Sequence, residues 1–150
     1  MRNTNEMELI FDSLSANEGF ARVAVAAFMT QLNPTVEEVA DVKTAISEAV
    51  TNAVIHGYEN EIHKIFIRCN IKEETIYIEV EDHGKGIEDV KKRWSRYLQQ
   101  SLKWIGREWD FVYGAFMDHI CVESVQGEGT TVKMQKTIGK GRKLWTTQSL

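Results

Sequence analysis

The sequence predicts an α+β fold, in which helices cover one face of a largely antiparallel sheet. Two helix-forming segments come early in the chain, and most of the strand-like runs follow them. Two pairs of these runs are joined by short polar turns, which is typical of antiparallel hairpins. The chain has 150 residues, of which 43% are hydrophobic, and this is enough for one core. We therefore expect a single domain over residues 1–150, built as a two-layer α/β sandwich.

The first part of the chain predicts a strand followed by a helix. Residues 7–11 alternate between apolar and polar side chains, as in a strand. Ser15 and Glu18 then fit a capping box, and Asn33 with Pro34 ends the helix because proline disfavours helical geometry in the preceding residue. The apolar positions at helical spacing, expected to face the core, are Phe20, Val23, Ala24, Ala27 and Phe28.

A second capping box follows at once, with Thr35 as the cap and Glu38 as its partner. The helix that it opens is expected to end at His56 and Gly57. Its expected buried positions are Val39, Val42, Ile46, Ala49, Val50 and Ala53.

The remaining strands are predicted as two pairs. Alternating runs at 65–71 and 76–80 flank a short polar turn, and runs at 120–125 and 130–135 flank a glycine-containing turn. Cys69 and Cys121 each lie inside an apolar strand-like run, which indicates two buried thiols in a reducing cytoplasm rather than a disulfide framework.

Charge and the lengths of apolar runs exclude several classes of function. With 18 basic and 22 acidic residues the formal net charge is −4, which disfavours a general nucleic-acid coat or a basic membrane-binding surface. The longest apolar stretch, 23–29, is far too short to span a bilayer, and residues 1–8 lack the apolar run of a signal peptide. We expect a cytoplasmic protein without direct contact with nucleic acid or membrane.

The second helix carries the first candidate for chemistry. Glu48 and Asn52 are four residues apart, so both side chains project from one helix face. A solvated helix face would explain such a pair by itself. However, the surrounding segment 49–55 is unusually apolar for an exposed face, and Asn is a poor residue inside a helix. A carboxamide oxygen at this place suits a hard cation such as Mg²⁺.

A second candidate follows the expected central strand, where Asp82 precedes Gly84 and Gly86 in an Asp-x-Gly-x-Gly motif. The glycines would let the backbone approach a ligand closely, and the carboxylate could accept a hydrogen bond from an exocyclic amine such as adenine N6. Ordinary turn chemistry is the alternative explanation, since Asp-x-Gly is also common in turns.

A third candidate is the segment 127–131, where Gly-Glu-Gly leads into Thr130 and the last strand. A tight hairpin explains the glycines by itself, and threonine is a good strand residue in any case. Each of the three signals is modest when it is taken alone.

Taken together and in this order, the three motifs resemble the GHKL (Bergerat) ATPase domain. The chain is closer still to the small bacterial anti-sigma factors with serine-kinase activity that act in sporulation. The stretches that carry this resemblance are 17–23, 47–58 and 116–118, and it covers roughly residues 7–90 and 114–137. The resemblance implies a mixed, largely antiparallel sheet with helices on one face.

The resemblance also implies roles for the candidate residues. Asn52 would hold the Mg²⁺ that bridges the phosphates of ATP, and Glu48 would act as general base toward a serine hydroxyl of a partner. Asp82 would bind adenine, while the site residues beside it would be Gly84, Gly86 and Thr130. A carboxylate suits the base role because phosphoryl transfer depends mostly on positioning and charge neutralisation.

The partners implied by the resemblance are two proteins and a second copy of the chain. The phosphoacceptor would be an anti-anti-sigma factor, the inhibited protein would be a sigma factor, and the chain would form a homodimer. Arg22 lies where family members carry an Arg that is plausible as a partner contact. An exposed helix arginine with no such role is the alternative.

The resemblance fails between residues 91 and 113, where the family has an ATP lid and a second Gly-x-Gly that cradles phosphates. This window instead holds three of the four tryptophans and a lone Gly106. One hypothesis is translation one base out of frame, because permitted codons from Lys92 to Phe111 can spell AMEPLFTTKPEMDRSGMGF, which resembles the missing lid. Each tryptophan has only the codon TGG, and the three give Glu, Asp and Gly in that frame.

The alternative is a genuinely diverged lid. In that case the protein would be a catalytically impaired module that binds the sigma factor without transferring phosphate. Residues 137–150, which include a basic run, are expected to form a solvated tail.

Overall fold

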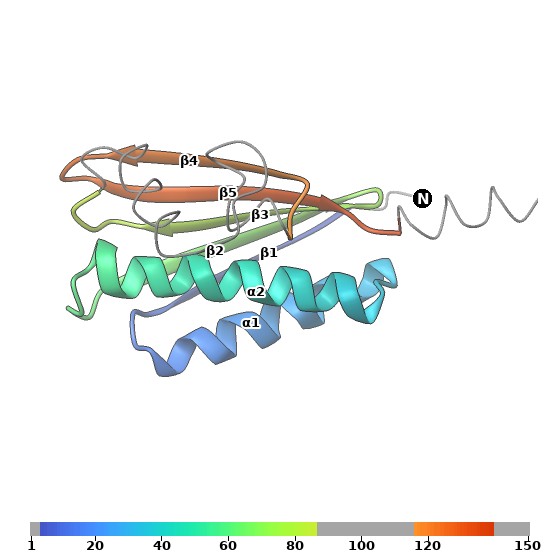
Figure 1. Ribbon diagram of the computed structural model, residues 1–150, viewed down its shortest axis with the longest axis horizontal. Helices are drawn as coiled ribbons and strands as arrows, with labels where there is room; N and C mark the ends of the chain where they lie inside the picture. Colours follow the sequence, from blue (N-terminus) through green and yellow to red (C-terminus); the bar gives the residue numbers. More distant parts are fainter. Residues whose placement is uncertain (1–3, 87–115, 140–150) are drawn as a thin grey trace, which may run out of the picture.

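The structure is a computed structural model that describes residues 4–86 and 116–139 (Figure 1). Two helices lie side by side under one face of a five-stranded sheet, which confirms the predicted two-layer α+β fold. The elements in chain order are β1 (Thr4–Asp12), α1 (Ala16–Met29), the 3₁₀ turn η1 (Thr30–Leu32), α2 (Val36–Asn52), the π-helical turn η2 (Ala53–Gly57), β2 (Lys64–Lys72), β3 (Thr75–Asp82), β4 (His119–Val125) and β5 (Gly129–Thr137).

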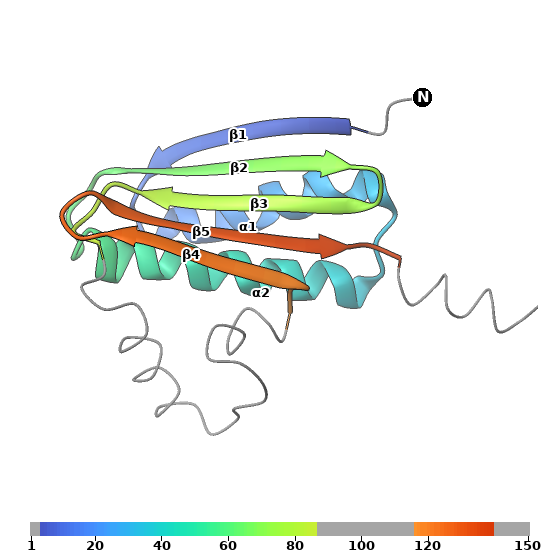
Figure 2. The ribbon, with the colours of Figure 1, turned by 90° about the horizontal axis from the view of Figure 1, so that it is seen from above.

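The strand order of the sheet is β1-β2-β3-β5-β4, and each neighbouring pair is antiparallel (Figure 2). Both predicted hairpins, β2–β3 and β4–β5, are present. β3 is therefore the central strand. Its last residue, Asp82, pairs with Thr130 near the start of β5, so the end of β3 and the start of β5 lie side by side at the same end of the sheet.

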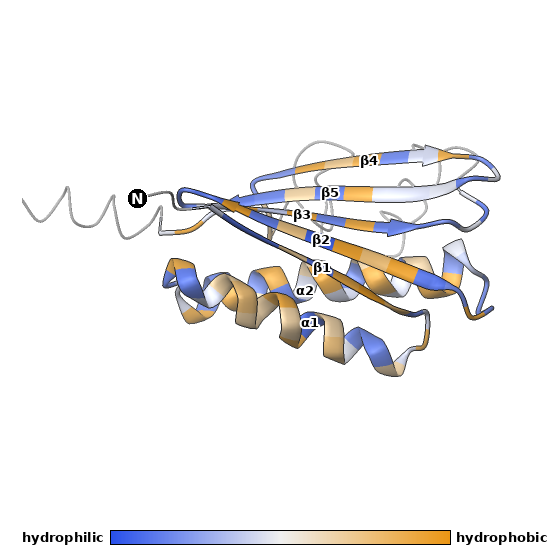
Figure 3. Cartoon of the chain, turned by 180° about the vertical axis from the view of Figure 1, so that it is seen from behind, coloured by the Kyte–Doolittle hydropathy of each residue, from blue (hydrophilic) through white to orange (hydrophobic). Residues whose placement is uncertain are grey.

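The core lies between the sheet and the two helices, where the apolar faces of both layers meet (Figure 3). Strand alternation sends every second side chain of the central strands toward the helices. The buried residues of β2 and β3 are Ile65, Ile67, Cys69, Ile71, Ile76, Ile78, Val80 and Asp82. Apolar burial of this kind supplies most of the free energy that holds the two layers together.

Helix α2 agrees closely with its prediction. Thr35 accepts a hydrogen bond from the amide of Glu38, and the Glu38 carboxylate accepts one from the amide of Thr35, so the expected capping box is formed. Five of its six expected core positions are buried, and Val39 is partly buried against the core.

Helix α1 differs from its prediction in two ways. Ser15 makes no side-chain cap, and Glu18 pairs with Arg22 instead of reaching back. The buried face is Ala21, Val25 and Met29, whereas Phe20 is 57% exposed and Val23 is 58% exposed. The helix is apolar almost all round, so that helical spacing alone could not decide which side faces the core. Of the expected core positions, Phe28 is packed partly against the core.

The prediction of two buried thiols is correct for Cys69 and wrong for Cys121, which is exposed. β4 is one of the two edge strands of the sheet. Its Cys121 points to the face that the helices do not cover, while the partly buried Ile120 and Val122 point to the core side. The position of Cys121 in the strand alternation therefore determines its exposure, and the apolar character of the run does not.

Within the described ranges, no helix is long and apolar enough to cross a membrane. The segment expected to be an atypical or frameshifted lid, 91–113, lies outside the described residues, and so does most of the expected tail. Ile138, at the start of that tail, is buried in the core.

Candidate functional site

Asp82 is a buried carboxylate at the end of the central strand. Its side chain is 6% exposed, because strand alternation turns it toward the helix layer together with Val80. Oδ1 accepts a hydrogen bond from the amide of Gly84 at 2.9 Å, and the Thr130 amide also bonds the carboxylate. Burial raises the pKa of Asp82, and these two amides oppose the rise. The group is therefore a fixed hydrogen-bond acceptor on a strand end.

Three glycines allow close backbone packing around this residue, and two of them, Gly57 and Gly129, contact it directly. A Cβ on Gly57 would stand 2.8 Å from Asp82 Oδ1, and a Cβ on Gly129 would stand 2.1 Å from the Asp82 carbonyl oxygen. A Cβ on Gly84 would stand 2.1 Å from the carbonyl oxygen of Gly57. Real Cβ atoms essentially never approach so closely, so Gly84 and Gly129, which face backbone atoms, require glycine, whereas a Cβ on Gly57 would displace the Asp82 side chain.

The helix that carries Glu48 and Asn52 reaches Asp82 through a π-helical turn. Residues 53–57 continue α2 as the π turn η2, which contacts β3 and β5. The Gly57 carbonyl accepts a hydrogen bond from the amide of Lys85 at 3.0 Å. Single π turns inside helices are frequent at functional sites. Here the turn joins the end of α2 to the loop after β3.

Tyr58, the residue after this turn, is a structural participant that the sequence analysis missed. Its side chain is buried, and its hydroxyl donates to the Lys64 carbonyl and accepts from the amide of His83 at 2.8 Å. Burial raises the pKa of Tyr58, which favours the protonated form that donates this bond. In the sequence Tyr58 follows an expected helix stop and ends the stretch 47–58 that carries the family resemblance, but no local pattern there indicates a distant partner.

The β4–β5 hairpin holds the same loop from its other side. The Lys85 carbonyl accepts a hydrogen bond from the amide of Gly127 at 2.6 Å. Gly86 has a φ of 74°, a left-handed conformation that side chains disfavour, and its Cβ would stand 2.3 Å from the Val125 carbonyl oxygen. The second glycine of the Asp-x-Gly-x-Gly motif is thus required by conformation and by space.

The other predicted site residues gather at this end of the molecule. Glu48 and Asn52 are partly buried on the last two turns of α2, and Asn52 directly precedes the π turn. Thr130 is the second residue of β5, and its hydroxyl lies 2.8 Å from the Ser124 hydroxyl. The end of α2, the end of β3 and the start of β5 lie together in both views (Figures 1 and 2).

Arg22 lies apart from this loop, on α1. Its guanidinium lies 3.1 Å from the Glu18 carboxylate and 3.3 Å from the hydroxyl of Ser47 on α2. The residue therefore bridges the two helices and remains partly exposed.

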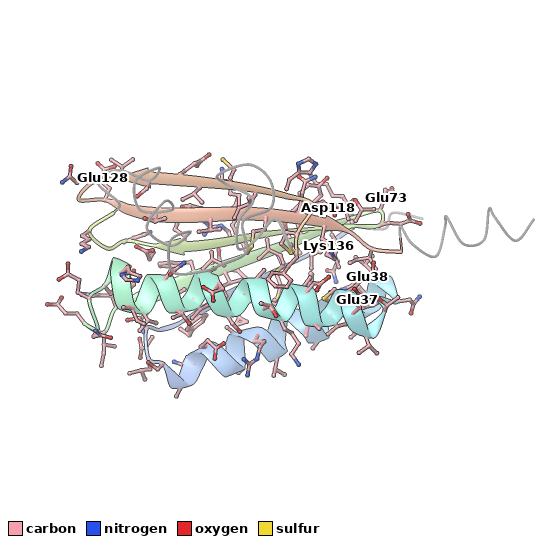
Figure 4. All side chains as sticks on the ribbon, viewed as in Figure 1. Glu37, Glu38, Glu73, Asp118, Glu128 and Lys136 are labelled. Carbon is pink, nitrogen blue, oxygen red and sulfur yellow. The ribbon has the colours of Figure 1, made fainter. Side chains whose placement is uncertain are left out.

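The opposite end of the sheet carries a separate polar cluster. Lys136 lies 3.7 Å from Asp41, and the Glu38 carboxylate also accepts a hydrogen bond from the amide of Gly139. Figure 4 shows Lys136 and Glu38 at this end, while Glu128 marks the β4–β5 turn at the Asp82 end. The cluster fastens the end of β5 to the start of α2, away from the candidate site.

The buried Asp82 carboxylate can accept a hydrogen bond from an amine of a ligand. Helix α2, which carries the Glu48 carboxylate and the Asn52 carboxamide, ends at the same end of the molecule. The Asn52 carboxamide supplies an oxygen of the type that a hard cation prefers. The Asp82 carboxylate and the Asn52 carboxamide are therefore compatible with a nucleotide that carries an exocyclic amine and is bound together with Mg²⁺.

Comparisons with known proteins agree with this geometry. Residues 12–136 match the family described as "Histidine kinase-like ATPase domain". The chain is 52% identical over 143 residues to an "Anti-sigma F factor" of Caldanaerobacter subterraneus subsp. tengcongensis, covering 95% of this chain and 100% of that relative. It is 44% identical over 144 residues to an "Anti-sigma F factor" of Oceanobacillus iheyensis, covering 94% of this chain and 98% of that relative.

A solved structure with the same fold is that of the RsbU and RsbW domains of a Mycobacterium tuberculosis protein. Its TM-score is 0.65 at 18% identity, and the match covers 89% of this chain but only 32% of that longer chain. This likeness concerns the fold, whereas the identity to the curated relatives extends over their whole length. The chain therefore belongs to the anti-sigma F factor family and carries a histidine kinase-like ATPase domain.

Proposed function

We propose that the protein binds ATP with Mg²⁺, inhibits a sporulation sigma factor and phosphorylates a serine of its anti-anti-sigma antagonist. The observation that carries this proposal is the buried Asp82 carboxylate, held in glycine contacts beside the end of the helix that bears Glu48 and Asn52. Membership of a family of anti-sigma factors with an ATPase domain supports it.

In this proposal Asp82 accepts a hydrogen bond from the adenine amine. Gly84 and Gly86 keep the loop close to the base, and Thr130 forms the neighbouring wall at the start of β5. Because the carboxylate is already fixed by amides and shielded from water, little ordering entropy remains to be lost when the base binds.

The transfer step needs an acceptor for the serine proton. Glu48 takes that proton as the serine oxygen forms a bond to the γ-phosphorus, while the bond between that phosphorus and the bridging oxygen breaks and ADP leaves. Asn52 would hold Mg²⁺, which supplies charge neutralisation at the phosphates. The two side chains lie one helical turn apart on one face of α2, about 6 Å along the axis, so one helix would position both functions.

The proposed sigma-binding surface includes α1. Phe20 and Val23 are exposed beside Arg22, so this helix presents apolar area and a guanidinium together. Apolar side chains with an arginine are the composition that protein interfaces favour. We include homodimerisation in the proposal on the basis of the resemblance alone.

A second candidate function is sigma-factor binding without phosphate transfer. The observation that favours it is the sequence of residues 91–113, which lacks the second Gly-x-Gly expected of a lid. Reading the coding DNA across this segment separates the two explanations. Bases that spell a lid in the shifted frame support the frameshift, and any other bases support a diverged lid.

The direct test is ATP-dependent transfer of labelled phosphate to the antagonist. Glu48→Gln should abolish transfer and leave nucleotide affinity nearly unchanged, because it removes the proton acceptor only. Asn52→Ala should weaken binding of ATP with Mg²⁺ but change binding of metal-free ATP little. If both variants bind ATP with Mg²⁺ alike, the division of roles is wrong. If the unaltered protein binds the sigma factor but transfers nothing, the second candidate function is correct.

A further inference from the structure

Three successive backbone amides after β3 are each bonded to a different group. The His83 amide donates to the Tyr58 hydroxyl, the Gly84 amide to Asp82 Oδ1, and the Lys85 amide to the Gly57 carbonyl. Two of these three acceptors belong to Gly57 and Tyr58, the adjoining residues that follow α2. The loop that sets the direction of the Asp82 carboxylate is thus held mainly by that short segment.

We propose that Tyr58 is a positioning residue that orients the Asp82 carboxylate toward the adenine amine, and thereby sets the preference for adenine. This inference rests on the proposed nucleotide-binding function. Tyr58 does not touch the base in the proposal. It acts through the His83 amide, which is the first amide after Asp82.

Only a hydroxyl on a long rigid side chain can perform this task here. The Tyr58 oxygen donates to the carbonyl of Lys64 at the start of β2 and accepts from the amide of His83 after β3. A phenylalanine would fill the same buried space but would leave that amide and that carbonyl without the shared hydroxyl. Unsatisfied buried polar groups cost free energy, so the loop would move to regain a partner.

The surroundings of Tyr58 keep its ring in place. The side chain is buried, and its ring centroid lies 4.9 Å from that of His63. The residue also directly follows the π turn that continues from Asn52. The carboxamide proposed to hold the metal and the hydroxyl proposed to orient the base-binding loop therefore lie at the two ends of this π turn, on Asn52 before it and Tyr58 after it.

The test compares two nucleotides that differ only in the exocyclic amine, ADP and purine riboside 5′-diphosphate. Binding of each is measured by calorimetry to the full chain and to its Tyr58→Phe variant. We expect Tyr58→Phe to weaken ADP binding about tenfold, the effect of one well-aligned hydrogen bond. The analogue without the amine should bind about equally to both proteins, because the lost alignment concerns only that amine.

Tyr77→Phe is the matched control. Tyr77 lies on the same strand as Asp82 but five residues earlier, roughly 16 Å along the strand, and it should change neither affinity. If Tyr58→Phe unfolds in part, the same comparison is made in a Gly19→Ala background, since a Cβ at Gly19 meets only Arg22 Nη2 at 3.7 Å and alanine favours the helix.

The outcomes distinguish the proposed role of Asp82 in binding adenine from the proposed role of Tyr58 in orienting Asp82. An unaltered protein that binds both nucleotides equally overturns the Asp82 assignment and this inference with it, and one that binds neither overturns the proposed nucleotide-binding function and this inference. A preference for ADP that persists in Tyr58→Phe overturns the inference alone. Equal weakening of both nucleotides also overturns it, because it would show a general structural role.

Discussion

The Cα atom of Gly57 lies directly against the carboxylate of Asp82, so that a Cβ on Gly57 would stand 2.8 Å from Oδ1 and 2.9 Å from Cγ. Gly57 ends the π turn after α2, and Asp82 ends β3. The contact therefore fixes the end of the helix layer against the end of the central strand. The absence of one side chain makes room for a buried charge at this point.

Gly57→Ala should weaken adenine-nucleotide binding and lower stability only moderately. The new methyl group would collide with the end of the Asp82 side chain, which can rotate away, whereas the backbone on either side need not move. Rotation would break the hydrogen bond from Gly84 and misdirect the carboxylate. We expect at least a tenfold loss of ADP affinity, measured by calorimetry, with a loss of about 1–2 kcal/mol in the free energy of unfolding.

Gly127→Ala is the companion variant for this experiment. Gly127 has a φ of 84° and open space around its Cβ position, so alanine there introduces backbone strain without touching Asp82. It should lower stability by about 1 kcal/mol and leave ADP affinity nearly unchanged. If both variants lose affinity in proportion to stability, the contact with Asp82 has no special effect.

Gly84→Ala should damage the fold itself. Its Cβ would stand 2.1 Å from the Gly57 carbonyl oxygen, and two backbone segments would have to separate to admit it. We expect the free energy of unfolding to fall by about 3 kcal/mol or more, measured by urea denaturation. Gly19→Ala, inside α1 and without such a collision, should instead raise it by about 0.5–1 kcal/mol. A Gly84→Ala protein as stable as the unaltered chain would contradict the close packing.

The sequence predicted correctly those elements whose residue pattern is compatible with only one buried face. α2 carries both a complete capping box and one apolar stripe, and β2 and β3 alternate without interruption. α1 is apolar on nearly every side, so its spacing fitted two faces, and the fold buries the one with the small residue Ala21. Such a choice depends on how closely two helices can approach, which no local pattern encodes.

The same distinction applies to the candidate site. The motif residues Asp82, Gly84 and Gly86 could be named because their spacing is local. Gly57 was predicted only as part of a helix stop and Tyr58 only as the end of the stretch 47–58, because the contacts that matter join them to residues 25 positions later in the chain. The backbone partner of a long-range hydrogen bond cannot be predicted from residue types, since every residue except proline carries the same amide donor.

Asp82→Asn should change the pH dependence of stability. Burial raises the pKa of Asp82 above its ordinary value of 3.8, so the folded state holds a proton that the unfolded state has already released. Stability therefore falls as pH rises through the range just above 3.8. Asparagine does not titrate, and its oxygen can still accept from Gly84. The stability of the variant relative to the unaltered chain should therefore rise as the pH increases above about 4 and then level off, measured by urea denaturation at several pH values.

ADP affinity measured on the same Asp82→Asn protein tests the proposed role of Asp82 in nucleotide binding. The variant should bind ADP more weakly at neutral pH, because a neutral amide is a weaker acceptor than a carboxylate. Parallel stability curves for the two proteins would contradict the raised pKa, and unchanged ADP affinity would contradict the role of Asp82.

Lys136→Met should destabilise the fold at the end away from the site. The Lys136 side chain is 13% exposed, and its Nζ lies 2.8 Å from the Phe116 carbonyl and 3.7 Å from Asp41. Burial raises the pKa of Asp41 while Lys136 lowers it, so removing the lysine leaves a partly buried carboxylate without its main opposing charge. We expect a loss of about 1–3 kcal/mol in the free energy of unfolding, measured by urea denaturation.

Lys133→Met is the control for this prediction. Lys133 lies on the same strand but forms an exposed ion pair with Glu123, so this substitution should have no measurable effect on the free energy of unfolding. Equal effects of the two substitutions would show that the buried contacts of Lys136 contribute nothing beyond those of a surface ion pair.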